Sequence, residues 1–186
     1  MNRLETLKEW IEADSQRMAA LRTASKLSLP GWSLAAGFVR NLAWDKFHCF
    51  DQATPLNDID LIYFDPDDVS KERDREIEQS LGAELPWSVK NQARMHSRNQ
   101  DPLYLSAADA MTYWVEVETA VGACLNEEGA LQLIAPFGVE SLFSGTISLN
   151  PKRPKIEECK RRIQDKRWLE LWSKLKIADC GSQLIV

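Results

Sequence analysis

Two aspartates separated by one residue lie in the apolar stretch NDIDLIYFD, residues 57–65. Side chains on a β-strand alternate between its two faces, so Asp58 and Asp60 are expected to share one face, with α-carbons about 7 Å apart. Two such carboxylates raise each other's pKa unless a cation lies between them. That cation is either a divalent metal that prefers oxygen ligands, such as Mg²⁺ or Mn²⁺, or a nearby Lys or Arg. Because Asp-x-Asp is common in proteins, the pair alone does not decide between them.

A glycine turn precedes the aspartates, in AAGFVRN, residues 35–41. Gly37 is expected to end a short strand and to open a helix, whose backbone N–H groups and dipole favour a phosphate. A phosphate-binding turn followed by paired carboxylates is what metal-assisted phosphoryl or nucleotidyl transfer requires.

The two motifs together resemble the polymerase-β nucleotidyltransferase superfamily, and especially the head domain of CCA-adding enzymes, whose glycine turn is followed by Val-Arg-Asp. With PWSVKNQARMH, IAPFG and a late NP, they also resemble an uncharacterised bacterial family of nucleotidyltransferase-like proteins over residues 32–151. The resemblance implies a metal-dependent nucleotidyltransferase, in which Asp58 and Asp60 hold Mg²⁺ (or Mn²⁺) and Gly37 forms the phosphate turn. It implies a nucleoside triphosphate as substrate and leaves the acceptor unidentified.

The turn departs from the family pattern, which has two small residues there. Ala36 stands where CCA-adding heads have the first glycine, and it adds a methyl group where the backbone approaches phosphate. By analogy with the Val-Arg-Asp turn, Arg40 either contacts phosphate or pairs with Asp45 on the helix surface. Asn41 is expected to cap or orient the turn, or to bind the phosphate together with it.

The third carboxylate of the superfamily comes from a strand beside the aspartate pair. The expected strand, PWSVKNQARMH, offers only Lys, Gln, Arg and His on its polar face. Either Glu116 or Glu118 supplies the third acid from elsewhere, or two carboxylates suffice. Lys90 and Arg94 either hold the triphosphate or neutralise the aspartates directly, and the second case gives a binding module that has lost its metal.

The remaining periodicity indicates an α/β (α+β) fold, a small mixed sheet flanked by helices. We expect one nucleotidyltransferase-like domain over residues 1–150 and a basic helical extension over 151–186 that packs on it. The expected elements are an opening helix over 1–27, strands near 32–36, 57–65 and 86–96, a polar helix ending near 82, a helix from 106, and a hairpin around NEEG at 126–129.

Composition restricts the remaining classes. The chain has 186 residues, is 44% hydrophobic and carries a net charge of -5. Its four cysteines form no CxxC pair, the N-terminus does not resemble a signal peptide, and no apolar run reaches the ~18 residues of a membrane span. We therefore expect a cytoplasmic protein without a membrane contact. Residues 151–186 hold ten Lys and Arg against five acids; a nucleic-acid contact through 152–176, involving Arg161 and Arg162, is an alternative that the acidic whole chain disfavours.

Overall fold

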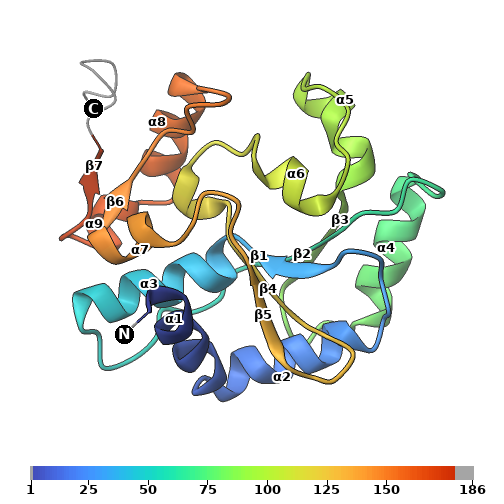
Figure 1. The fold of residues 1–186 in the computed structure, drawn as a ribbon, viewed down its shortest axis with the longest axis horizontal. Coiled ribbons are helices and arrows are strands. Elements are labelled where there is room, and N and C mark those ends of the chain that lie inside the picture. Colours follow the sequence, from blue (N-terminus) through green and yellow to red (C-terminus); the bar gives the residue numbers. More distant parts are fainter. Residues whose placement is uncertain (1, 179–186) are drawn as a thin grey trace.

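The computed structural model describes residues 2–178 and has a five-stranded mixed sheet at its centre (Figure 1). The strand order is β3-β2-β1-β4-β5, and within this sheet only the β2–β3 pair is parallel. The strands are β1 (Ser33–Ala35), β2 (Ile59–Tyr63), β3 (Trp87–Asn91), β4 (Gly122–Leu125) and β5 (Leu131–Ile134). The prediction of a small mixed sheet flanked by helices is confirmed.

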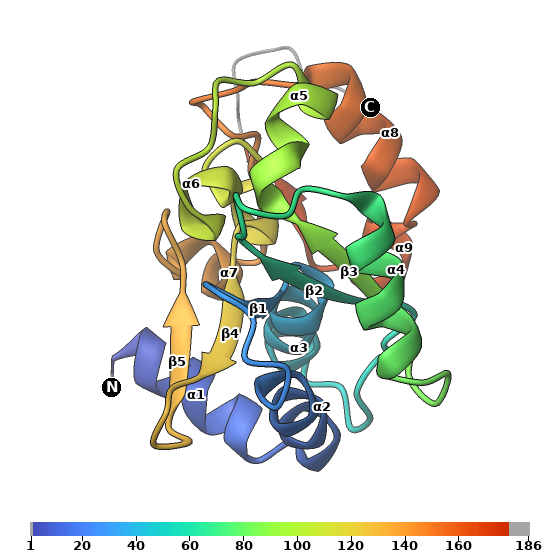
Figure 2. The same cartoon turned by 90° about the vertical axis from the view of Figure 1, so that its right-hand side faces the viewer.

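Helices cover both faces of this sheet (Figure 2). One side carries α1, α2 and α3, and the other carries α5 and α6. The helices are α1 (Arg3–Glu12), α2 (Ser15–Ser25), α3 (Gly37–His48), α4 (Lys71–Ser80), α5 (Met95–Asn99), α6 (Ala107–Met111), α7 (Glu140–Ser144), α8 (Ile156–Asp165) and α9 (Trp168–Leu171), with 3-10 turns η1 (Gln92–Arg94) and η2 (Val117–Thr119).

The alternation along β2 separates the core from the site. Ile59, Leu61 and Tyr63 are fully buried in the main core, which α1, α2 and α3 complete. Asp60 and Ile62 point to the other face, where Ile62 packs in a smaller cluster with residues of α6. The strand therefore carries its carboxylate on the face that α5 and α6 only partly cover.

Two predicted elements differ from the structure. The opening helix is two helices, because Asp14 interrupts it and accepts a hydrogen bond from the backbone N–H of Arg17 (3.0 Å) as the N-cap of α2. The strand expected over 86–96 ends at Asn91, and the chain turns there into η1 and α5. The predicted hairpin is formed by β4 and β5.

The region after residue 145 builds a second core. The short parallel strands β6 (Thr146–Ile147) and β7 (Lys176–Ile177) pair, and Trp168 and Trp172 pack edge-on against Trp44 of α3. The end of the predicted basic extension, residues 179–186, lies outside the described residues. No helix within residues 2–178 is both long and apolar enough to cross a membrane.

Candidate functional site

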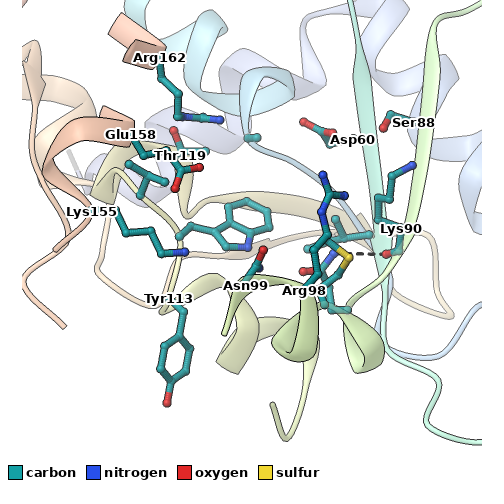
Figure 3. Close-up of a pocket in the computed structure, with 16 residues that line it drawn as sticks. Asp60, Ser88, Lys90, Arg98, Asn99, Tyr113, Thr119, Lys155, Glu158 and Arg162 are labelled. Carbon is teal, nitrogen blue, oxygen red and sulfur yellow. Dashed lines mark hydrogen bonds between the residues drawn. The ribbon is translucent and has the colours of Figure 1, made fainter. Parts of the chain in front are cut away.

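A cleft of about 410 Å³ opens on the sheet face that carries Asp60 (Figure 3). Strands β2 and β3 form one wall of the cleft, and α5 and α8 form others. The side chains that line it include Ala36, Asp60, Ser88, Lys90, Arg98, Asn99, Tyr113, Trp114, Thr119, Lys155, Glu158 and Arg162.

Asp60 lines this cleft, and Asp58, two residues before it in the chain, is not among the lining residues. In the sheet, Asp60 is directly opposite Ala35 on one side and Ser88 on the other. Burial and, to a lesser extent, the charge of Asp58 raise the pKa of Asp60 to about 6, against the opposing effects of Arg40, Lys166 and Arg162. Asp58 is half-exposed. The pair therefore attracts a cation at physiological pH.

The cation beside Asp58 in this structure is Lys166, whose Nζ lies 3.7 Å from Asp58 Oδ2. This differs from the prediction that Lys90 or Arg94 would neutralise the aspartates. Lys90 lines the cleft, but its Nζ donates a hydrogen bond to the carbonyl of Val89 (2.9 Å).

Arg94 does not line the cleft; it follows the end of β3, where the chain turns into η1 and α5. Asn91 is fully buried, and its side-chain oxygen accepts hydrogen bonds from the backbone N–H groups of Asp65 (3.1 Å) and Ala93 (3.0 Å), which fixes the turn out of the strand. Arg94 instead forms an ion pair with the buried Asp74. The expected placement of Arg94 beside the aspartates is thus wrong.

The glycine turn has an unusual backbone conformation. Ala36 has φ 56° and ψ -119°, a region that glycine adopts far more readily than alanine. Its N–H donates to the carbonyl of Val121 (2.9 Å). Gly37 then begins α3, and no side chain within the described part of the chain caps this helix end. The backbone N–H groups of Val39 and Arg40 donate to the carbonyl of Ala36 (3.2 and 2.9 Å), which leaves those of Gly37 and Phe38 for an anion.

Arg40 is buried beneath this turn. Its guanidinium donates to Thr119 Oγ1 and to Asn41 Oδ1, both at 2.9 Å, and it lies over the rings of Trp44 (4.9 Å) and Trp168 (4.5 Å). Burial lowers the pKa of Arg40 to about 10, and the charges of Glu116 and Asp60 oppose this shift. Arg40 and Asn41 thus hold the turn and the residues behind it together.

The alternative partner of Arg40, Asp45, is engaged elsewhere. Asp45 accepts hydrogen bonds from the Thr54 backbone (2.8 Å) and from Nε1 of Trp172 (2.8 Å). The expected surface pair between Arg40 and Asp45 is therefore not formed.

Neither candidate for a third carboxylate faces the aspartate pair. Glu116 is buried and accepts hydrogen bonds from Arg162 Nε and Thr119 Oγ1, both at 2.8 Å. Glu118 accepts one from the backbone N–H of Ser148 (2.8 Å), and burial raises its pKa. Among residues 2–178, no group of three or more His, Cys, Asp or Glu side chains is placed to hold a metal ion.

Comparison with known proteins identifies the family. A model of the nucleotidyltransferase family matches residues 22–177, which is most of the chain. The chain belongs to this nucleotidyltransferase family. The resemblance that the motifs predicted is confirmed.

Solved structures agree with this assignment. The nucleotidyltransferase is similar to a protein whose NMR structure reveals a CCA-adding enzyme head domain, with a TM-score of 0.79 and 32% identity over 93% of this chain and 94% of that one. A CCA-adding enzyme in complex with CTP shares the fold, with a TM-score of 0.59 and 16% identity over 94% of this chain and 43% of that one. Another, in complex with ATP, has a TM-score of 0.56 and 15% identity over 88% and 39%. The nucleotidyltransferase thus spans less than half of these two enzymes, and no curated protein matches it.

Three further cations line the cleft: Arg98 was not predicted, and Lys155 and Arg162 were expected only within a segment that contacts nucleic acid. Arg98 comes from α5, and Lys155 and Arg162 come from the region of α8 (Figure 3). The basic character of residues 151–186 was the available signal, but it does not say which face of the helix meets the sheet.

Proposed function

We propose that this nucleotidyltransferase moves a nucleoside monophosphate from a nucleoside triphosphate to an acceptor, with Asp58 and Asp60 as ligands of Mg²⁺ or Mn²⁺. The observation that carries the proposal is the environment of Asp60. Asp60 is mostly buried, its pKa is raised to about 6, and the charge of a second carboxylate, Asp58, acts on it. A cation bound in the cleft would stabilise the ionised form of Asp60.

The side chains present fit such a metal. Mg²⁺ commonly binds through one or two carboxylates together with substrate phosphates, so a site with Asp58 and Asp60 alone is consistent with it. When bound, the metal neutralises charge on the triphosphate and supports attack by the acceptor. The hydroxyl of Ser88, directly opposite Asp60 in the sheet, adds a further oxygen at the same level.

The rest of the cleft suits a triphosphate. Four cationic side chains line it, against two acidic ones: Lys90, Arg98, Lys155 and Arg162, with Asp60 and Glu158. We propose that the uncapped N-terminus of α3 at Gly37 holds phosphate oxygens, with Lys90 binding the same group from the sheet. Arg40 and Asn41 act by positioning this turn.

The extension over 151–178 belongs, in this proposal, to the same functional unit as residues 1–150. Arg162 of α8 donates to the buried Glu116, and Arg153 pairs with the fully buried carboxylate of Asp101. Removing the extension would leave both acids buried without a counter-charge, which is strongly unfavourable.

One observation favours a second candidate, a non-catalytic module that binds a nucleotide or a partner through the same cleft. Lys166 pairs with Asp58, and neither Glu116 nor Glu118 completes a set of three carboxylates. If the ion pair replaces the metal permanently, nucleotide binding does not depend on a divalent cation.

A thermal-shift titration separates the two candidates. The protein is titrated with ATP, CTP, GTP and UTP in the presence of Mg²⁺, Mn²⁺ or EDTA. For the enzyme, we expect at least one nucleotide to raise the Tm only with metal, and the rise to disappear in the Asp58→Asn, Asp60→Asn double variant. An Asp67→Asn variant, in the exposed loop after β2, is the control and keeps the full shift. Stabilisation that is equal in EDTA supports a nucleotide-binding module without catalysis, and no stabilisation by any combination contradicts the enzyme and leaves only a module that binds a partner.

A further inference from the structure

Lys166 lies where the basic extension meets Asp58, one residue before β2. It follows the last residue of α8, and its Nζ lies 3.7 Å from Asp58 Oδ2. Lys166 is therefore close enough to pair with one of the two proposed metal ligands.

The backbone at this position is held on both sides. Ile163 before it and Trp168 after it are 3% and 2% exposed and pack in the second core. Between them, Arg167 adopts φ 52° and ψ 38°, a left-handed conformation that is uncommon for residues other than glycine. The junction between α8 and α9 thus presents Lys166 at a defined place.

The side chain, in contrast, is free to move. Lys166 and Asp58 are 54% and 51% exposed, and an exposed ion pair of this kind contributes little to stability. A divalent ion held by Asp58 would carry twice the charge of the ammonium group and would displace it. The freed ammonium group would then be available to a phosphate oxygen.

Arg162 lies one helical turn before Lys166, on the same side of α8. Arg162 also lines the cleft. One of these two cations lines the cleft, and the other pairs with Asp58.

We propose that Lys166 is a substrate-binding residue that pairs with Asp58 in the empty site and binds the triphosphate once a metal occupies the two aspartates. This inference rests on the proposed function, because it requires a metal and a triphosphate in the same cleft. It gives the Asp58–Lys166 pair a purpose other than replacement of the metal. It also makes the basic extension a direct part of the binding site.

Calorimetric titrations of Lys166→Met test the role in two steps. The probes are Mg²⁺ alone, and then inorganic triphosphate at saturating Mg²⁺, which removes any dependence on the base. We expect Mg²⁺ alone to bind about twofold to fivefold more tightly than to the wild type, because Asp58 loses its competitor, and triphosphate to bind about fivefold more weakly. Lys166→Arg restores most of the triphosphate affinity. The control, Lys160→Met, removes a cation of the same helix that pairs with Glu157 and changes neither affinity.

Each other outcome decides against the inference. If Lys166→Met binds triphosphate as tightly as the wild type or more tightly, Lys166 only competes with the metal, and the inference fails while the proposed function stands. If the wild type binds no triphosphate with either Mg²⁺ or Mn²⁺, the proposed function fails, and the role of Lys166 fails with it.

Discussion

Replacement of Asp60 by Asn is expected to stabilise the protein while it removes a proposed metal ligand. In the metal-free protein, burial and the charge of Asp58 raise the pKa of Asp60 from 3.8 to about 6. Near neutral pH, where Asp60 is ionised, that difference lowers the free energy of unfolding by about 3 kcal/mol. The amide that replaces the carboxylate carries no charge, so the variant avoids most of this cost.

The effect has a defined pH dependence. Because the folded-state pKa of Asp60 is raised, the folded protein holds its proton more tightly than the unfolded chain between about pH 4 and pH 6. The wild type therefore loses stability as the pH rises through this window, and Asp60→Asn does not. We expect the variant to be about 3 kcal/mol more stable at about pH 7, and less than about 1 kcal/mol more stable at about pH 4.

Urea unfolding in EDTA, at several pH values from about 4 to 8, measures this difference. Asp58→Asn is the matched comparison; because burial is the larger cause of the raised pKa of Asp60 and the charge of Asp58 the smaller one, this replacement is expected to stabilise the protein by less than about half as much. An Asp60→Asn variant that is less stable than the wild type at neutral pH, or a gain that does not depend on pH, would refute the view that the unpaired charge of Asp60 strains the folded protein.

Two further predictions concern the glycine turn and the segment around β3. Ala36→Gly relieves a backbone conformation with φ 56° and is expected to stabilise the protein by about 1 kcal/mol, after the added entropy of the unfolded chain is subtracted, as thermal or urea unfolding would show; a loss of stability contradicts it. Arg94→Met leaves Asp74 buried without its counter-charge and is expected to destabilise the protein by about 3–5 kcal/mol. Lys90→Met, in the cleft, is expected to weaken nucleotide binding and to leave the unfolding midpoint nearly unchanged. If Lys90→Met has a lower unfolding midpoint and binds nucleotide as the wild type does, Lys90 stabilises the fold and does not bind nucleotide.

The sequence was sufficient for features set by neighbouring residues. The alternation along NDIDLIYFD placed Asp60 opposite the core face, and the glycine at 37 marked the start of α3, because both depend on local backbone geometry. The nucleotidyltransferase assignment followed from the order of these local motifs, and the family match confirmed it.

Features that depend on distant segments were not predictable in the same way. β3 ends at Asn91 because its side chain binds the loop around Asp65, and periodicity within 86–96 carries no trace of that contact. Lys166 reaches Asp58 only because Trp168 and Ile163 dock the extension on α3. For this reason the expected strand extends too far, and the alternative in which Lys90 or Arg94 neutralises the aspartates named other cations than Lys166.

The most direct test of the proposed function is a crystal structure with Mn²⁺ and a nucleoside triphosphate, solved with anomalous scattering from the metal. The account predicts an anomalous peak about 2.1 Å from carboxylate oxygens of Asp58 and Asp60, phosphates at the N-terminus of α3, and Lys166 moved from Asp58 toward a phosphate oxygen. A bound nucleotide with Lys166 still paired to Asp58, and no metal between the aspartates, would contradict the account.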